Sequence, residues 1–500
     1  MTELTLETKL SRRRSNPVGK LEPYSLDNGI FLPSLRDTPS VTLPGHNIPY
    51  IFRRRAITTY WLRDYKIPCR YGMANSLYRP VAIDLFAGAG GFSLGIEQAG
   101  FDVAVAVEQD PIHAAVYTFN FPHTRVLCAD IATLSGREIK DAVGKWASHN
   151  GQQTDWGGEI DLVFGGPPCQ GFSMMGKGLP DDVRNNLVFE FCRLVKELQP
   201  RYFVMENVPG LCLRKHSSVL SRLISGFKAA GYEVTEPVQV LNAASFGVPQ
   251  QRRRLFLLGA QVGNTALIYP DPELRSKSQQ LTVREAIADL PNLDKFTKLS
   301  HTDCIQLTPA QLNQIHHQMS LYVKSLRDLT TDTSNFAYPR QWNPQLLTSS
   351  MQTQHTETSI ERFQKTLVGQ LEPISRLRRL DWNKPCYTLR AGTGVERGSY
   401  TSPRPIHPEY PRVISVREAA RLHSFPDWFR FHMTKWHGFR QVGNAVPPLL
   451  ARVLGRQVVA ALEVQALMPM TPLELGDAQL LRFKQSQASN YWETLRNLGE

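Results

Sequence analysis

The chain has 500 residues, a formal net charge of +12 and a hydrophobic fraction of 42%. Its length predicts two to four domains with a full core, and its composition is that of an ordinary globular protein. No apolar run reaches the roughly 18 residues of a membrane-spanning helix. The basic cluster 12–14 precedes Ser-Asn-Pro rather than an apolar segment, which argues against an export signal. We therefore expect a cytoplasmic protein that does not enter a membrane.

The net charge and the cysteine pattern limit the kinds of partner and reaction that we expect. A surplus of positive charge permits a polyanionic partner such as nucleic acid, without requiring one. The seven cysteines are scattered and include no C-x-x-C pair. We expect neither a metal site nor a disulfide framework, so each thiol remains a candidate nucleophile.

The first predicted strand covers residues 80–86 and runs into a glycine-rich turn and a helix that ends at Gly100. A second strand ends in Glu108, twenty residues after Gly88, the spacing at which a carboxylate accepts hydrogen bonds from ribose hydroxyls. Strand, glycine turn and helix are typical of the first unit of a nucleotide-binding α/β fold. Ser93 stands where the third glycine of G-x-G-x-x-G would be, which favours a nucleoside-bearing cofactor without a pyrophosphate.

The alternation of strands and helices continues to about residue 262. It predicts a doubly wound, mostly parallel sheet. Further strands are expected at 126–131, 201–206 and 254–258, with helices near 186–198 and 218–230. From about 263 to 400 the periodicity fades and polar residues become frequent. An amphipathic helix is expected up to Leu462, followed by a loosely attached helical tail.

One cysteine lies at a forced turn. Residues 160–164 read as a short buried strand that runs into Gly-Gly-Pro-Pro and then Cys169. Two prolines fix φ and remove two backbone donors, so neither helix nor strand continues through them. Cys169 is therefore expected on a loop at the carboxyl end of a strand, where ligands bind in open α/β sheets. The alternative is a small buried cysteine in a turn.

Charged residues are predicted to meet this cysteine. Glu206 ends one strand, and the run 250–254, with Arg252 and Arg254, precedes another. If the sheet forms as predicted, these three side chains and Cys169 converge at one edge. Taken singly, Glu206 could be a capped strand end and the arginines a solvated charge run.

In this order, these segments resemble the cytosine-C5 DNA methyltransferases of bacterial type. The resemblance covers roughly residues 80–465 and is carried by 84–92, Glu108, Asp130, 166–173, 206–208, 250–254, 417–426 and 441–448. It implies a Rossmann-like α/β sheet that depends on S-adenosylmethionine, together with a second, smaller and irregular target-recognition domain.

The predicted organisation has five parts. Residues 1–79 form a basic extension with 13 Lys and Arg against 6 Asp and Glu, which could be a DNA-contacting arm or a solvated tail. Residues 80–290 form the catalytic domain, 291–435 the target-recognition domain, and 436–465 a motif and helix that return to the catalytic domain. Residues 466–500 form the tail.

The resemblance implies a covalent mechanism. Cys169 adds to C6 of cytosine and makes C5 nucleophilic toward the sulfonium methyl of the cofactor. Glu206, protonated at least transiently, faces N3 and is expected to have a raised pKa. Arg252 is expected to bind O2 of the base, and Arg254 to support the site through neighbouring loops. Because C5 is unreachable in a duplex, the base must be flipped out.

The resemblance also assigns binding residues. S-adenosylmethionine would be held by Phe86, Ala87, Gly88, Gly90, Gly91, Phe92, Glu108, Gln109, Asp130, Ile131, Pro168, Leu187, Asn444, Ala445 and Val446. Glu108 would hold the ribose hydroxyls, Asp130 the adenine amine, and 444–446 the methionine end. The stretch 170–187 resembles a loop that closes over DNA, with Gln170 and Ser173 as DNA contacts.

The implied partner is double-stranded DNA with a short recognition sequence. The chain is expected to act as a monomer, and a cognate restriction endonuclease could exist. Three alternatives remain: a related enzyme that acts on tRNA, a catalytically inactive DNA-binding relative, and a nucleotide-dependent oxidoreductase. The long irregular region argues against the first, the presence of Cys169, Glu206 and Arg252 against the second, and the departure from G-x-G-x-x-G against the third.

Overall fold

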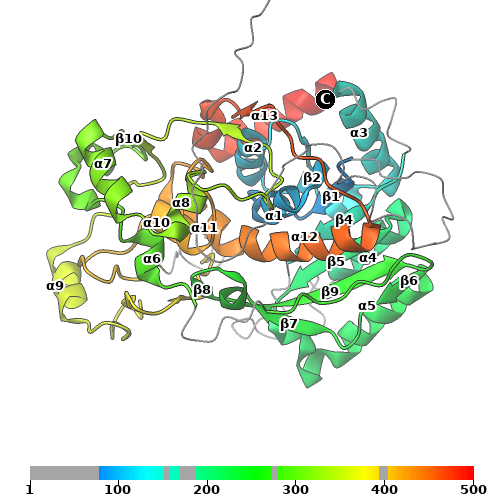
Figure 1. Cartoon of the computed structure of the whole chain (residues 1–500), viewed down its shortest axis with the longest axis horizontal. Helices are drawn as coiled ribbons and strands as arrows, with labels where there is room; N and C mark the ends of the chain where they lie inside the picture. Colours follow the sequence, from blue (N-terminus) through cyan, green and yellow to red (C-terminus); the bar gives the residue numbers. More distant parts are fainter. Residues whose placement is uncertain (1–77, 151–157, 169–186, 273–279, 393–403, 500) are drawn as a thin grey trace, which may run out of the picture. The chain divides into compact units, whose positions relative to one another are not determined.

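A central sheet of eight strands organises the computed structural model, in the order β3-β2-β1-β4-β5-β9-β6, with β7 paired to β9 (Figure 1). The structure describes residues 78–150, 158–168, 187–272, 280–392 and 404–499, all within one compact unit, Met73–Glu500. The strands are β1 Val81–Leu85, β2 Asp102–Glu108, β3 Arg125–Cys128, β4 Leu162–Gly165, β5 Tyr202–Asn207, β6 Tyr232–Val234, β7 Gln239–Asn242 and β9 Arg253–Gln261.

The direction of one strand decides which residues share an edge. The first five strands of the path, β3 to β5, pair in parallel, whereas β9 is antiparallel to its neighbours β5, β6 and β7. The amino end of β9 therefore lies beside the carboxyl end of β5, with Leu255 opposite Asn207. This confirms the mostly parallel sheet and explains how a run that precedes a strand reaches the carboxyl edge.

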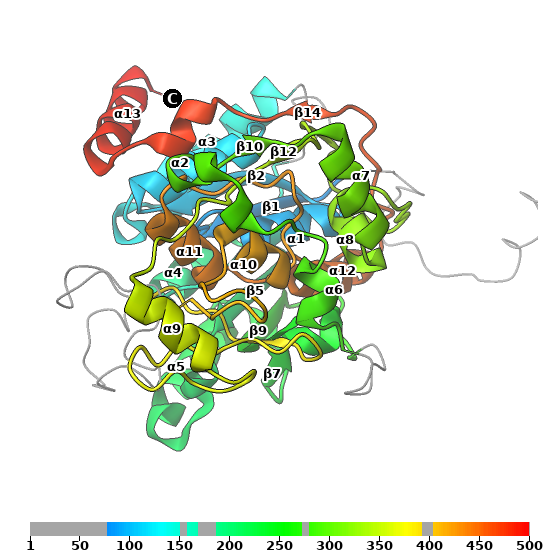
Figure 2. The same cartoon turned by 90° about the vertical axis from the view of Figure 1, so that its left-hand side faces the viewer.

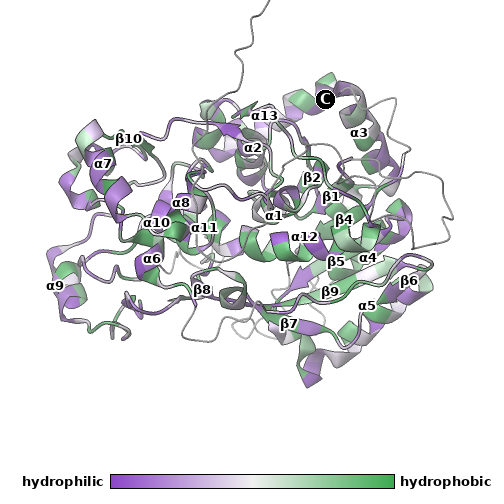
Figure 3. Ribbon diagram, in the orientation of Figure 1, coloured by the Kyte–Doolittle hydropathy of each residue, from purple (hydrophilic) through white to green (hydrophobic). Residues whose placement is uncertain are grey.

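Helices cover both faces of the sheet because its strands are apolar on both sides. Val163 and Phe203 pack with α3 Gly136–His149, α4 Leu187–Leu198 and α5 Ser217–Ala229. Their neighbours Phe164 and Val204 pack with α1 Gly91–Ala99 and α12 Pro448–Leu462. Apolar residues follow the central strands and alternate with polar ones along α12 (Figure 3).

Glycines set the contact between α1 and α12. A Cβ on Gly95 would come within 2.3 Å of the carbonyl oxygen of Pro448, and one on Gly455 within 2.6 Å of the Cβ of Ala99. The two helix backbones can approach this closely only because both positions lack a side chain. The C-terminal motif is thereby fixed against the glycine turn that begins α1, although about 350 residues separate them.

Short helices and two-residue strands make up the irregular region (Figure 2). They pack against one another and against the sheet region. Its helices are α6 Val283–Ile287, α7 Pro309–Gln318, α8 Leu321–Leu326, α9 Glu357–Lys365, α10 Val416–Leu422 and α11 Lys435–Asn444; its two-residue strands include β8 Gln250–Gln251, β10 Ile305–Gln306, β11 Arg340–Gln341, β12 Leu346–Leu347 and β13 Cys386–Tyr387. One hydrophobic cluster joins Tyr117 and Phe121 of the sheet region to Phe425 and Phe429. The domain boundaries given above stay a prediction.

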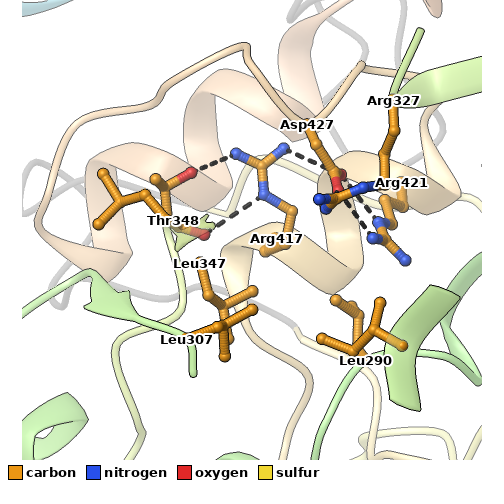
Figure 4. Close-up of a pocket in the computed structure, with 10 residues that line it drawn as sticks. Leu290, Leu307, Arg327, Leu347, Thr348, Arg417, Arg421 and Asp427 are labelled. Carbon is orange, nitrogen blue, oxygen red and sulfur yellow. Dashed lines mark hydrogen bonds and ion pairs between the residues drawn. The ribbon is translucent and has the colours of Figure 1, made fainter. Parts of the chain in front are cut away.

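Buried arginines organise this region. Arg421 donates from Nε and Nη2 to both carboxylate oxygens of Asp427, each at 2.8 Å, and from Nη1 to Asp289 at 2.6 Å. Arg417 donates to the hydroxyl and the carbonyl of Thr348 (Figure 4). It also donates to the carbonyls of Pro426 and Phe429. The cavity between them has a volume of about 10 Å³, room for a single water, so it is a packing defect and not a ligand site.

The C-terminal segment is not loosely attached, which corrects the prediction for residues 466–500. β14 Leu473–Glu474 pairs with β11, and a 3-10 helix, Ala478–Arg482, and helix α13 Gln485–Leu498 pack on α2 Pro111–Asn120. Although this segment is mostly polar, four of its residues are buried and anchor it: Leu480, Leu481, Ala488 and Trp492.

Among the described residues, one stretch is long and apolar enough to cross a bilayer, Lys435–Leu462. It comprises α11 and α12, and more than half of its most apolar part, 56%, is buried. Its contact with α1 accounts for that apolar character, because the stretch forms part of the core.

Candidate active site

Glu206 and Arg254 meet at the carboxyl edge of the sheet. Glu206 is the fifth residue of β5 and Arg254 the second of the antiparallel β9, and Arg254 Nε lies 2.7 Å from Glu206 Oε1. Burial raises the pKa of the Glu206 carboxyl above its ordinary value, while Arg254 and then Arg252 act in the opposite direction. A carboxyl group that keeps a proton near neutral pH can donate a hydrogen bond or a proton.

The second oxygen of Glu206 faces the proline turn. A Cβ on Gly166 would lie 3.0 Å from Glu206 Oε2, so only a glycine fits comfortably here. Asn207 Nδ2 donates to the carbonyl of Pro167 at 3.3 Å and ties the turn to β5. Pro168 is exposed, and Cys169, Gln170 and Ser173 lie outside the described residues. The carboxyl group therefore points at the chain three residues before the predicted nucleophile.

The structure places the two arginines in different surroundings. Arg252 is 1% exposed, and it donates from Nη1 to the carbonyl of Leu389 at 3.0 Å and from Nη2 to that of Gly443 at 2.9 Å. A guanidinium committed to two backbone carbonyls in the core is not placed to bind a base. Arg254 is the arginine with a partly exposed side chain, and it lies beside Glu206. Residues two apart on a regular strand share a side, but Arg252 lies between β8 and β9, where the strand is interrupted, so alternation does not predict its direction.

Gln250, two residues earlier, completes this internal support. Its Oε1 accepts from the N–H of Leu389 at 3.0 Å, and its Nε2 lies 2.9 Å from His423 Nδ1. His423 Nε2 lies 2.9 Å from the carbonyl of Ala445. Because Gln250 Nε2 can only donate and the carbonyl can only accept, His423 must be neutral, with its proton on Nε2. Burial, with Arg252 nearby, accordingly holds the pKa of His423 well below its ordinary value.

Sequence reasoning missed His423. It lies within the matched stretch 417–426, which drew attention to its arginine and proline residues and not to the histidine. A lone histidine between Leu422 and Ser424 carries no signal of a partner 22 residues away. Its role depends on the packing that brings Gln250 and Ala445 to opposite sides of the ring.

The glycine turn after β1 forms the other side of the site. Phe86 has a φ of +70°, and Gly88 and Gly90 also have positive φ, so the backbone turns sharply below the strand end. A Cβ on Gly90 would lie 2.3 Å from the ring of Phe121, whereas one on Gly88 would meet no atom within 4 Å. The space at Gly88 is open, as a cradle for a bound molecule requires.

Glu108 closes this cradle. Its Oε2 accepts from the N–H of Gly88 at 2.7 Å, and its Oε1 from the N–H of Asp110 at 2.8 Å. Burial raises the pKa of the carboxyl, and His113 and these hydrogen bonds oppose that rise. Each oxygen keeps a further lone pair, so the group can still accept from ribose hydroxyls.

Ser93, which replaces the third glycine of the dinucleotide pattern, has a structural partner. Its hydroxyl donates to Asp84 and accepts from the hydroxyl of Tyr117 at 2.8 Å, and all three groups are buried. Burial holds the pKa of Asp84 well above its ordinary value. Ser93 therefore links α1 to β1 and α2, and it does not leave the start of α1 open to a pyrophosphate.

The other predicted cofactor residues divide into two groups. Gln109, Pro168 and Asn444 are exposed, and Phe86, Asp130, Leu187 and Ala445 are partly buried around the carboxyl edge. Ala87, Gly91, Phe92, Ile131 and Val446 are buried. Phe92 lies 4.8 Å from Phe164, ring to ring, and packs in the sheet core with Val446. We therefore find these two side chains in the core and not facing the open space.

A groove lined by arginines opens beside this site. It encloses about 540 Å³ and is lined by Gln251 of β8 together with Arg376, Arg378, Arg390, Arg404, Tyr387 and Thr388. Thr388 donates to the carbonyl of Gln251 at 2.6 Å, and β13 pairs with β8. Arg378 lies over the exposed ring of Tyr387 at 4.4 Å. Cationic and aromatic groups thus continue from the catalytic edge into the irregular region.

Comparison with known proteins identifies the class. The family model for C-5 cytosine-specific DNA methylases matches residues 81–460. The chain belongs to this family, and it is a DNA cytosine-C5 methyltransferase of bacterial type.

Individual relatives agree. The chain is 48% identical over 411 residues to the type II methyltransferase M.XorII of Xanthomonas oryzae pv. oryzae, which covers 82% of this chain and 92% of that one. It is 32% identical to the type II methyltransferase M.DdeI of Desulfomicrobium norvegicum, over 75% and 88% of the two chains. A crystal structure of an Escherichia coli prophage protein, assigned as a DNA modification methyltransferase, aligns with a TM-score of 0.60 at 31% identity, over 77% and 99%.

Proposed function

We propose that this enzyme transfers a methyl group from S-adenosylmethionine to C5 of a flipped-out cytosine within a short double-stranded DNA sequence, through a covalent bond between Cys169 and C6. The observation that carries the mechanism is the Glu206 carboxyl. It is buried, has a raised pKa, is paired with Arg254 on one oxygen and faces the proline turn with the other.

Glu206 acts on the N3 edge of the base. A carboxyl group that is protonated in part at neutral pH can hydrogen-bond to N3 and draw electron density from C6. Attack by the Cys169 thiolate at C6 then forms the C–S bond and leaves the electron pair at C5. After methylation, loss of the C5 proton and departure of the thiolate restore the aromatic ring.

Arg254, and not Arg252, binds the O2 oxygen of the base in this proposal. Its guanidinium is fixed beside Glu206 by the ion pair, and Arg254 Nη1 donates to the carbonyl of Arg253 at 2.8 Å. Arg252 acts from behind the site as a positioning residue. By binding the carbonyls of Leu389 and Gly443, it holds the start of β9 against the C-terminal motif.

S-adenosylmethionine, when bound, supplies an electrophilic methyl group on a sulfonium. The residues present fit this molecule: the turn is open at Gly88, Glu108 ends β2, and Asp130 follows β3 by two residues and caps the 3-10 helix Ile131–Thr133. Glu108 would orient the ribose and Asp130 the adenine, while Phe86 and the turn lie beneath the methionine part. Asn444 and Ala445 would close the methionine end, where His423 holds the carbonyl of Ala445.

The arginine groove is the proposed DNA surface. Guanidinium groups neutralise phosphates and read guanine edges in the major groove, and both kinds of contact suit an irregular, loop-built wall. Because β13 pairs with β8, DNA in this groove would place a flipped base toward Glu206. We further propose that the enzyme acts as a monomer in the cytoplasm and, like type II methyltransferases, protects DNA from a cognate endonuclease.

The decisive experiment measures methyl transfer from labelled S-adenosylmethionine to unmethylated genomic DNA and to tRNA, with bisulfite sequencing of the DNA product. Wild type is expected to place 5-methylcytosine in one short sequence context, and Cys169→Ala to place none. A denaturation-resistant complex with DNA containing 5-fluorocytosine, formed by wild type and absent from Cys169→Ala, tests the covalent bond directly. Label in tRNA alone would overturn the substrate, and label in neither would favour a catalytically inactive DNA-binding relative.

A further inference from the structure

We infer that the C-terminal helix α13 is a positioning element for the cofactor site, because it holds the carboxyl ends of β2 and β3 from outside. This inference rests on the proposed function, in which Glu108 and Asp130 bind the adenosine part of S-adenosylmethionine. Helix α13 lies after residue 460, beyond the stretch that the family model matches.

The first link runs through Trp492. Its ring is 7% exposed, and its Nε1 donates to the carbonyl of Pro111 at 2.9 Å. Pro111 is the first residue of α2 and directly follows Asp110, the residue that caps this helix. The backbone N–H of Asp110 donates in turn to Glu108 Oε1 at 2.8 Å. Trp492 is thus two hydrogen bonds away from the carboxylate that would hold the ribose.

The second link runs through Arg496, one helical turn later. Its Nη2 donates to the carbonyl of Cys128 at 3.1 Å. Cys128 pairs with Glu108 in the sheet register and lies two residues before Asp130. Since β3 is the edge strand of the described sheet, no further strand supports its outer side, and a donor from α13 satisfies a carbonyl there.

Apolar packing makes these links firm. Leu480, Leu481, Phe483 and Tyr491 form a cluster with Ala115, Val116 and Phe119 of α2. The segment is also tied to the irregular region, since Met433 donates its N–H to the carbonyl of Leu481 at 2.9 Å. In both views α13 lies beside α2 (Figures 1 and 2). This docking fixes the start of α2, from which Glu108 takes its orientation.

Loss of this docking should affect cofactor binding and not DNA binding. Loosening α13 allows the start of α2 and the end of β3 to shift, which misplaces Glu108 and Asp130 together. Binding of S-adenosylmethionine should weaken, whereas DNA binding, which the proposed function assigns to the arginine groove, should not. Methyl transfer at saturating cofactor should remain close to that of wild type.

The test compares two tryptophans that make the same kind of bond. Trp492→Phe removes the indole N–H that reaches Pro111, and Trp146→Phe removes one that reaches the carbonyl of His123 at 2.8 Å. His123 precedes β3, at the opposite end of that strand from Asp130. Both tryptophans are buried, so the two substitutions should cost similar stability and differ only in where the bond was.

The measured quantities are the dissociation constants of S-adenosylmethionine and S-adenosylhomocysteine, by calorimetry without DNA, and that of a DNA duplex. Trp492→Phe is expected to weaken cofactor binding about three- to tenfold, the effect of one net hydrogen bond. Trp492→Phe combined with Arg496→Met should weaken it further, with DNA affinity unchanged. Hydrogen exchange should rise at residues 108–113 and 128–132 in these variants and not in Trp146→Phe.

Unchanged cofactor affinity in the double variant, or equal weakening in Trp146→Phe, would overturn the inference. Failure of the proposed function would look different, because wild type itself would then neither bind the cofactor nor methylate DNA.

Discussion

The carboxyl edge of the sheet and the irregular region both bury charge, but they treat it differently. In the irregular region, Arg421 is satisfied by Asp427 and Asp289, and Glu418 by both Nη atoms of Arg412 at 2.9 and 2.8 Å. Burial alone would raise the pKa of Glu418, yet Arg412 outweighs it and lowers the pKa to about 2. Glu418 and Asp427 stay ionised because each has guanidinium donors on both carboxylate oxygens, whereas Asp289, which is paired through one oxygen only, has a raised pKa.

At the sheet edge, Glu206 has one guanidinium partner on one oxygen, and burial prevails, so that its pKa is raised. This difference separates two uses of a buried carboxylate, one for stability and one for substrate binding. A fully paired carboxylate contributes to the core of a region that has only short helices and strands. An incompletely paired carboxylate keeps an oxygen that can bind a substrate. Changes to the first kind should cost stability, and changes to the second should cost rate.

The largest expected effect is on rate, at Glu206. Glu206→Gln should lower the methyl-transfer rate by about 10²- to 10⁴-fold, because an amide cannot pass a proton to N3. Its thermal stability should stay close to that of wild type, since the amide keeps the shape and can still accept from Arg254. The control is Glu236→Gln, which changes an exposed ion pair with Lys228 and should leave the rate intact. A folded Glu206→Gln enzyme of normal rate would contradict the assignment.

Arg421 shows the opposite behaviour. Arg421→Met should lower the free energy of unfolding by about 3–5 kcal/mol, because it leaves Asp289 buried without its cation and removes two donors from Asp427, which keeps only Arg327 and Arg417. Urea unfolding measures this loss. Lys228→Ala, which removes an exposed lysine from its surface ion pair with Glu236, should change stability by less than about 1 kcal/mol. Similar losses in the two variants would remove the distinction drawn above.

Acid should remove the stabilisation that the fully paired carboxylates provide. The pKa of Glu418 and that of Glu97, which binds Arg340, are each about 2 in the folded protein, below the ordinary value of 4.5. A lowered pKa stabilises the fold above pH 4.5, and this contribution is lost as the pH falls from 4.5 toward 2, about 3 kcal/mol for each group. Between pH 5 and pH 3, unfolding measurements should show a smaller loss for Glu418→Gln than for wild type. Parallel curves for the two proteins would contradict this.

The two arginines at the start of β9 give the smallest and sharpest contrast. Arg252→Lys loses one of two hydrogen bonds to buried carbonyls and should lower the free energy of unfolding by about 1–3 kcal/mol. Arg254→Lys should leave stability within about 1 kcal/mol and lower the rate, because lysine lacks the planar fork of donors. Thermal unfolding and single-turnover rates of the same two proteins measure both effects. The reverse result would restore the roles expected from the sequence.

Local chemistry in the sequence determined the elements and most residues of the site. Glycines that need positive φ, a pair of prolines before Cys169, and acids at strand ends are properties of short segments, and they placed the turn, Glu108 and Glu206 correctly at the sheet edge. Strands β1, β2, β4, β5 and β9 and helices α1, α4 and α5 lie within a few residues of their predicted positions because the periodicity is strong there, whereas α2, α3, β6 and β7 were not predicted.

The tertiary structure alone decided what depends on partners far along the chain. Which of Arg252 and Arg254 is buried follows from Leu389 and Gly443, and the neutrality of His423 follows from Gln250 and Ala445. The docking of α13 depends on a surface of α2 formed some 370 residues earlier. Local patterns carry the preference of a segment for helix or strand, but the side on which a side chain is buried is set by the segment that packs against it.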